Sequence, residues 1–368
     1  MSASGVPVTT ADGYAALRST AAVHVRARDV LSVSGADAVP YLQGQCSQDL
    51  AGLGPGRSTE SLLLSPQGKV DAYIRLTGRD DGSFILDTDA GWGPVVTARL
   101  ERFRLRMKVE ITALDWICVA VRGPGSAAGI IGRPELSVAV EWPGWSGVDL
   151  LGPAPVGAAE GSASGVDQWV DAGVVRCGDG AWEAARIEAG VPIAGHEEVE
   201  GAIPAELGLV DRTVSFTKGC FTGQELVARI DSRGSNVPRR LAGVIIPADP
   251  GPVAGGPGTS SPETGLPPVG ATVLTADGNH EVGRLSSVAW SPGWEGAVAL
   301  ALLHRRVTPP EDVLVRWDPD RGPGTAPGAA PGAAPDPSPD PVGGAGTGST
   351  SRVGRSRPLP LTPLTGPV

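Results

Sequence analysis

Residues 218–225 read Lys218-Gly219-Cys220-Phe221-Thr222-Gly223-Gln224-Glu225 and place a cysteine and a lysine on a glycine-rich turn. A turn ahead of a helix brings a thiol close to the helix N-terminus, and both that N-terminus and a neighbouring ammonium favour the thiolate. We therefore expect Cys220 to be the reactive group and Lys218 to activate it. The alternative is a small core residue, because free cysteine is among the most buried residue types.

The residues after this turn predict a short helix. Thr222 and Glu225 have the spacing of a capping box, in which each side chain bonds to the backbone of the other residue. The helix would begin at Gly223 and end near Gly234. Its apolar face would consist of Leu226, Val227 and Ile230.

The octapeptide resembles the K-G-C-[FY]-x-G-Q-E motif of the YgfZ family of folate-binding proteins, which are relatives of the glycine-cleavage T-protein (aminomethyltransferase). T-proteins typically carry Asp where this chain has Cys220, and Arg where it has Gln224. Residues 30–50 (VLSVSGADAVPYLQGQCSQDL) resemble the opening strand and helix of the same family. Residues 185–195 (ARIEAGVPIAG) resemble its R-x-E-x-G-x-P segment.

The resemblance implies an α+β protein of aminomethyltransferase-like fold, with ferredoxin-like units around a central folate cavity and a small C-terminal β-barrel. We expect a folate-binding region of two α+β subdomains at 1–235 and the barrel at 236–318, with a Gly/Pro-rich loop at 249–268. Residues 319–368 are rich in Pro, Gly and Ala and offer little apolar surface to bury. We expect this tail to be disordered and its removal to leave stability unchanged.

The pattern of apolar residues along the chain supports this fold and domain organisation. Strands at 59–64 and 69–77 flank Ser65-Pro66-Gln67-Gly68 and predict a hairpin. A helix at 92–105 leads into a basic stretch, 99–108, which carries five basic residues and an apolar stripe. We interpret those basic residues as a solvated face, with an anion site for a polyglutamate or phosphate tail as the alternative. Further strands are predicted at 30–33, 84–87, 115–122, 147–151, 271–274, 281–288, 297–303 and 312–316, and further helices at 12–22, 35–44 and from 181.

Composition and charge exclude several classes of protein. The formal net charge is −10 and the pI about 5.0, which argues against nucleic acid as a direct partner of the whole surface. No apolar run approaches the ~18 residues of a membrane span. The first residues, MSASGVPVTT, lack the features of a secretory signal. We expect a cytoplasmic monomer without a membrane partner.

The cysteines argue against a metal site held by this chain alone. Cys46, Cys118, Cys177 and Cys220 are scattered, without a C-x-x-C pair. Disulfides and a self-contained zinc or iron–sulfur site are therefore not expected, since such sites need a full set of ligands. We expect no bound metal.

The resemblance also implies where tetrahydrofolate, or a derivative of it, is bound. Glu188 falls where T-proteins use a glutamate to accept hydrogen bonds from the pterin ring, and a carboxylate suits that edge because it only accepts. The alternative for Glu188 is a helix-surface charge. The other expected folate contacts are Arg186, Phe221, Gly223 and Gln224.

Whether the chain is an enzyme stays open. The G-G-x-x-D-D stretch of T-proteins corresponds here to residues 68–73, which puts Ala72 where the catalytic Asp would stand. Asp71 is one residue off, and on a strand such an offset turns the side chain to the other face.

Two functions follow from the resemblance. The first is a folate-binding accessory protein that supports iron–sulfur enzymes, including tRNA-modifying ones, through Cys220 and through iron–sulfur client or assembly proteins as partners. The second is a tetrahydrofolate-dependent aminomethyl transferase or demethylase, which needs a carboxylate near folate N5 or N10.

Overall fold

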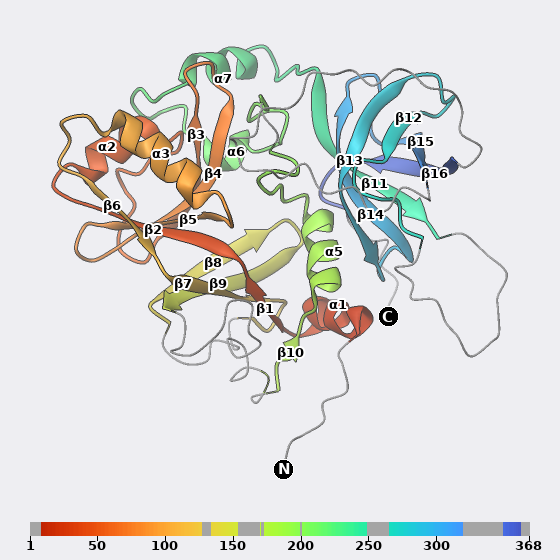
Figure 1. The fold of residues 1–368 in the computed structure, drawn as a ribbon, viewed down its shortest axis with the longest axis horizontal. Helices are drawn as coiled ribbons and strands as arrows, with labels where there is room; N and C mark the ends of the chain where they lie inside the picture. The colour runs from red at the N-terminus through yellow and green to blue at the C-terminus, as the bar shows by residue number, and fades with distance from the viewer. Residues whose placement is uncertain are drawn as a thin grey trace. The chain divides into compact units, whose positions relative to one another are not determined.

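The computed structural model describes residues 9–126, 134–153, 170, 173–198, 201–248, 265–318 and 349–361 (Figure 1). The chain forms two compact units. The first, the sheet unit, comprises Met1–Trp182 and Glu198–Asn236, and the second, the barrel unit, comprises Glu183–Glu197 and Val237–Val368. Residues 183–197 were expected in the N-terminal region, whereas they group with the barrel.

The sheet unit contains two five-stranded sheets. The first is antiparallel throughout and consists, in spatial order, of β3 (Ser58–Leu64), β4 (Val70–Gly78), β5 (Phe84–Asp89), β2 (Arg28–Ser34) and β6 (Glu110–Leu114). The predicted hairpin is confirmed, since the Gly68 N–H donates to the Ser65 carbonyl at 2.8 Å in the turn between β3 and β4.

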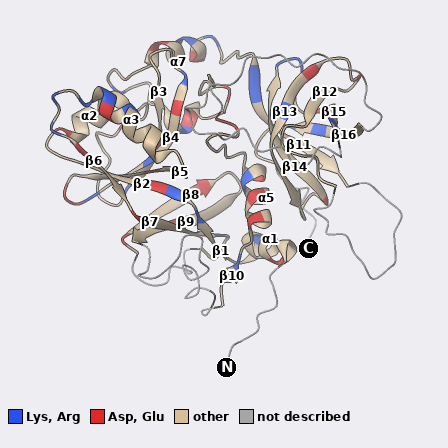
Figure 2. Ribbon diagram, in the orientation of Figure 1, with Lys and Arg blue, Asp and Glu red and all other residues tan. Residues whose placement is uncertain are grey.

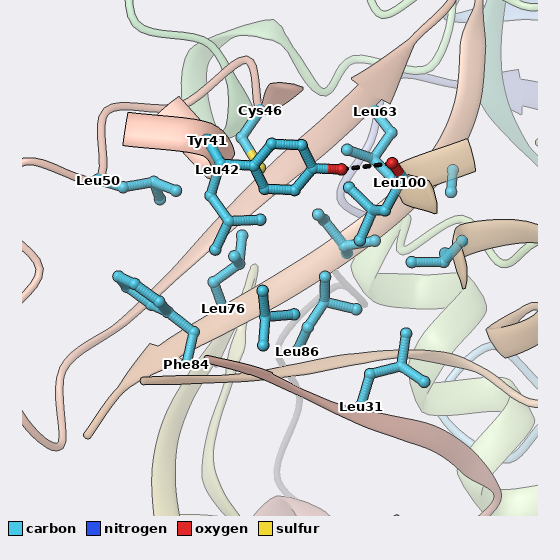
Figure 3. Packing of buried hydrophobic residues seen from close by; sticks show 14 of the residues in the cluster. Leu31, Tyr41, Leu42, Cys46, Leu50, Leu63, Leu76, Phe84, Leu86 and Leu100 are labelled. Atoms are coloured by element: carbon cyan, nitrogen blue, oxygen red, sulfur yellow. Dashed lines mark hydrogen bonds between the residues drawn. The ribbon is translucent and has the colours of Figure 1, made fainter. Parts of the chain in front are cut away.

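Helices α2 (Ala38–Gln45) and α3 (Gly93–Arg104) share a hydrophobic core with the first sheet (Figure 3). Leu42 from α2 and Leu100 from α3 lie among Leu76 and Leu86 of the strands, and none of these side chains is exposed. The Tyr41 hydroxyl donates to the Leu100 carbonyl at 2.5 Å, so this buried polar group is satisfied. Burial of these side chains fixes α2 against the first sheet.

The second sheet contains, in order, β10 (Val175–Arg176), β1 (Ala22–Arg26), β7 (Trp116–Arg122), β9 (Trp145–Pro153) and β8 (Leu136–Trp142). β10 pairs parallel to β1, and the other pairs are antiparallel. Helix α1 (Thr10–Ser19) precedes β1, and α5 (Asp179–Ala189) follows β10. The two sheets are linked by ion pairs.

Figure 2 colours Lys and Arg blue and Asp and Glu red, and both colours occur on strands of the two sheets. The ion pairs that join the sheets are made by buried side chains. Arg75 on β4 donates to Asp87 on β5 at 2.8 Å and to Asp149 on β9 at 2.7 Å. Arg122 on β7 reaches Asp149 at 2.6 Å. Burial alone would raise the pKa of Asp149, but the surrounding arginines outweigh it and hold that pKa below its usual value. The charged carboxylate therefore ties the two sheets together.

The barrel unit contains a closed antiparallel six-stranded barrel, as expected from the resemblance. Its order is β11 (Arg239–Pro247), β14 (Gly296–His304), β13 (Glu281–Ser291), β12 (Thr272–Thr275), β15 (Glu311–Trp317) and β16 (Thr350–Arg357). Small and branched side chains, among them Ala299, Ala301 and Val315, fill the interior, which suits the narrow lumen of a small barrel.

The expectation that residues 319–368 are disordered is wrong for residues 349–361. β16 pairs with β15 and with β11 and so closes the barrel. Its inward-facing residues are Gly354 and Ser356, which are buried but not hydrophobic. The strand therefore lacks the large apolar residues that indicate a buried strand in a sequence. Residues 319–348, residues 362–368 and most of the 249–268 loop lie outside the described residues.

Removal of β16 should destabilise the barrel unit. A chain that ends at Asp318 leaves β11 and β15 each without one pairing partner, so backbone hydrogen bonds are lost. A loss of about 2 kcal/mol would lower the Tm of a domain of this size by roughly 5–10 °C in thermal unfolding followed by circular dichroism. A chain that ends at Leu361 is the control. Equal Tm values for both chains would show that β16 adds nothing.

Candidate functional site

The motif turn lies in the sheet unit, between α6 (Val210–Thr213) and α7 (Gln224–Asp231). Cys220 is exposed, and the other three cysteines, Cys46, Cys118 and Cys177, are buried. Burial raises the pKa of each of those three thiols to about 12. Cys220 is therefore the only one of the four thiols that meets solvent, and the core alternative for it is wrong.

Lys218 anchors the turn to the end of α2. Its Nζ donates to the carbonyls of Gln43 at 2.8 Å, Cys46 at 2.7 Å and Gln48 at 2.9 Å. These three bonds use all three donors of the ammonium, and a cation is favoured at a helix C-terminus. Burial lowers the pKa of Lys218 from its usual value. These bonds hold the ammonium against the end of α2. The predicted role of Lys218 as an activator of Cys220 stays a prediction.

The charge of Lys218 acts on a buried thiol. Burial raises the pKa of the Cys46 thiol to about 12, and the positive charge of Lys218 offsets part of this rise. The ring of Phe221 also lies by the ammonium, with its centroid 5.3 Å from Nζ. Phe221 therefore helps to cover the anchor, and its predicted folate contact stays a prediction.

Main-chain bonds extend this anchor along the segment. The Thr222 N–H donates to the Gly44 carbonyl at 3.2 Å, and the Ser215 N–H donates to the Ser47 carbonyl at 3.0 Å. The Ser47 hydroxyl donates to the Thr213 carbonyl at 2.6 Å. The chain on both sides of Cys220 is thus held against residues 44–47.

Glycines let the motif pack on the β3–β4 hairpin. Gly223 has φ 83°, and a Cβ on it would lie 2.5 Å from the Ser65 carbonyl oxygen. A Cβ on Gly68 would lie 2.7 Å from the Leu226 Cβ. The main chain at Gly223 thus lies directly against the hairpin. At Gly219, by contrast, a Cβ would meet nothing within 4 Å.

The predicted capping box is also wrong. Gly223 is the N-cap of α7, and no side chain caps it. The Gln224 side chain instead accepts from the Phe221 N–H at 3.2 Å and closes the turn. A left-handed N-cap places Thr222 outside the position that the capping box requires. The predicted folate contacts of Gly223 and Gln224 remain predictions.

The strand at the expected catalytic position carries no usable carboxylate there. Ala72 is 1% exposed and lies in the hydrophobic core of the first sheet. Asp71 faces the other way and pairs with Arg99 at 3.0 Å. Arg99 also donates to Gln45 at 3.0 Å and to the Leu64 carbonyl at 2.8 Å. The basic stretch 99–108 is therefore not solvated throughout, because its first arginine is buried.

Arg186 and Glu188 lie in the barrel unit, so the structure places them in a different unit from the motif. Arg186 donates to Glu183 at 2.5 Å, to Glu197 at 3.2 Å and to the Ser287 hydroxyl at 2.5 Å. These contacts assign it to holding residues 183–197 on β13. Its predicted folate contact stays a prediction.

Glu188 is fully buried, so the alternative of a surface charge is wrong. Its carboxylate accepts from the Ser291 hydroxyl of β13 at 2.5 Å. Sequence reasoning missed Ser291 and Ser287, because isolated serines about a hundred positions away carry no signal of a contact. Only the fold brings them to the R-x-E segment.

No group of three or more His, Cys, Asp or Glu side chains in the described residues is placed to hold a metal ion. Among the helices of the described ranges, none is long and apolar enough to cross a membrane.

Substitution of Lys218 by methionine should lower stability, because three carbonyls at the end of α2 lose a charged donor. Hydrogen bonds to charged groups contribute about 1.5–3 kcal/mol, and we expect a loss of that order in urea unfolding. The exposed Lys69→Met is the control. Unchanged stability with slower alkylation of Cys220 would contradict the anchor and favour the activator role.

Comparison with known proteins gives the family. No family model matches the chain. An uncharacterized protein of Haemophilus influenzae is 30% identical over 209 residues, which cover 56% of this chain and 67% of that protein. A tRNA-modifying protein YgfZ of Enterobacter sp. is 28% identical over 222 residues, 56% of this chain and 66% of that one. An iron–sulfur cluster assembly factor IBA57 homolog of Mycosarcoma maydis is 31% identical over 221 residues, which cover 56% of this chain and 53% of that protein.

The chain thus spans between half and about two thirds of the length of these relatives. Among solved structures, aminomethyltransferase T of the glycine cleavage system from Bartonella henselae is similar with a TM-score of 0.70 at 19% identity. The match covers 97% of this chain and 90% of that one. At this identity the likeness shows the fold, which is the aminomethyltransferase fold. The sequence relatives show that the chain belongs to the YgfZ family.

Proposed function

We propose that the protein is a folate-binding accessory factor for the assembly, repair or maintenance of iron–sulfur enzymes, with Cys220 as its working group. The observation that carries this proposal is the placement of the motif thiol: it is exposed, while the backbone around it is held against the end of α2. A thiol held in this way is accessible to a partner and fixed in position. The relatives of the protein include proteins named for iron–sulfur cluster assembly and for tRNA modification.

The chemistry of a single thiol indicates what the partner must supply. A thiolate is a soft ligand that suits iron in clusters. One cysteine provides one ligand, so the remaining ligands come from an iron–sulfur client or assembly protein. The link to tRNA modification then runs through such a client, since the acidic net charge of −10 disfavours direct binding of nucleic acid. We propose a cytoplasmic monomer that meets these clients transiently.

Tetrahydrofolate is the ligand we propose for Glu188. The carboxylate is buried and oriented by Ser291, which makes it a fixed anionic acceptor. Such an acceptor suits the N–H donors of a pterin edge. Folate, when bound, would supply a one-carbon carrier. Glu188 would orient its ring, with Arg186 as a further contact in the barrel unit. The folate contacts of Phe221, Gly223 and Gln224 remain predictions from the resemblance.

Aminomethyl transfer is the second candidate, favoured by the shared fold with aminomethyltransferase T. That reaction needs a carboxylate that can hold or move a proton near the folate nitrogens. Position 72 holds a buried alanine, and Asp71 is paired with Arg99. These two observations favour the accessory role over the transferase.

A deletion strain tests the role of Cys220. Cys220→Ser keeps the size of the side chain and removes the soft ligand, so it should fold, bind folate and fail to restore iron–sulfur enzyme activity. Wild type and Cys177→Ala serve as controls, because Cys177 is buried. Full rescue by Cys220→Ser would remove the thiol from the mechanism.

Thermal unfolding with tetrahydrofolate tests Glu188. Ligand linkage predicts stabilisation of about 2.7 kcal/mol at a hundredfold excess over the dissociation constant. Glu188→Ala should lose most of this gain, whereas Glu225→Ala, an exposed residue of the motif, should keep it. If Glu188→Ala responds to folate as wild type does, the assignment of Glu188 is wrong.

A further inference from the structure

We propose that residues 349–361, here called the C-terminal strap, position Glu188 for its ligand. This inference rests on the proposed binding of folate by Glu188. The sequence predicted this segment to be disordered, whereas its β16 pairs with β11 and β15 of the barrel unit.

The first contact is a main-chain bond to Glu188 itself. The Leu361 N–H donates to the Glu188 carbonyl at 2.7 Å, and Leu361 is 4% exposed. α5 ends at Ala189, so this carbonyl belongs to the last turn, where carbonyls lack partners within the helix. The strap thereby caps the helix at the residue that would face the ligand.

The second contact depends on two glycines that make room for the strap. A Cβ on Gly190 would lie 2.9 Å from both the Cβ and the Cδ1 of Leu359. A Cβ on Gly243 of β11 would lie 2.5 Å from the Leu361 Cδ2. A larger residue at Gly190 would collide with the Leu359 Cβ, and one at Gly243 would force the Leu361 side chain to move. Leu359 and Leu361 therefore fit against the helix end and the barrel wall.

The barrel fixes the strap in turn. β16 pairs with β15 from Glu311↔Ser356 to Trp317↔Thr350. The buried Ser356 hydroxyl donates to the Glu311 carbonyl at 2.7 Å and accepts from the Glu311 N–H at 3.1 Å. These two hydrogen bonds fix the register of β16 against β15, and this register determines where Leu361 lies.

The barrel unit consequently holds both the main chain and the side chain of Glu188. The strap holds its main chain, and Ser291 of β13 holds its carboxylate at 2.5 Å. An acceptor that is fixed before the ligand arrives avoids the entropic cost of ordering it on binding. Displacement of the strap should therefore weaken the ligand complex through Glu188.

A pair of glycine variants in the full chain tests this role. Gly190 and Gly208 have φ values of 70° and 68°, so alanine strains the backbone at both sites. Only Gly190→Ala also collides with Leu359, since a Cβ on Gly208 meets nothing within 4 Å. Hydrogen exchange should rise across residues 349–361 in Gly190→Ala and not in Gly208→Ala. Tetrahydrofolate should bind Gly190→Ala about tenfold more weakly, as measured by titration calorimetry.

A double-variant cycle separates positioning from general damage. In a Glu188→Ala background, Gly190→Ala should cause no further weakening, because the strap acts through Glu188. The same tenfold loss in both backgrounds would overturn the inference. So would wild-type affinity in Gly190→Ala with a displaced strap. A wild type that does not bind tetrahydrofolate would instead overturn the proposed function, and the strap's role with it.

Discussion

The ammonium of Lys218, bound to three main-chain carbonyls at the end of α2, is the interaction on which the site depends. Without it, residues 215–222 would keep only a few main-chain bonds to residues 44–47. The hydrophobic core of the first sheet holds α2, and α2 through Lys218 holds the turn. The lysine of the motif thus fixes where the thiol lies, and the thiol keeps its access to solvent.

Local patterns in the sequence predicted local structure well. The Ser65–Gly68 hairpin and the helix at 93–104 both follow from turn chemistry and the period of the apolar residues. The partners of Lys218 could not be predicted, because main-chain carbonyls carry no residue signature. β16 was missed because its buried positions are Gly and Ser. In each missed case the stabilising contact comes from a residue distant in sequence.

The two parts of the proposed function rest on different physical devices. Cys220 combines an exposed sulfur with an anchored backbone, which suits contact with a partner protein. Glu188 is a buried acceptor oriented by Ser291, which suits recognition of a small ligand. Ala72, which the resemblance aligns with the catalytic Asp of T-proteins, is buried. A fold shared with an aminomethyltransferase does not by itself imply a shared reaction.

The rate of alkylation of each cysteine, followed by mass spectrometry of the native protein at neutral pH, tests the central claim most directly. Cys220 should react first, because it alone is exposed. Cys46, Cys118 and Cys177 should react only on unfolding, since they are buried and their pKa values are raised to about 12. Equal rates for all four, or a buried cysteine that reacts ahead of Cys220, would contradict the account.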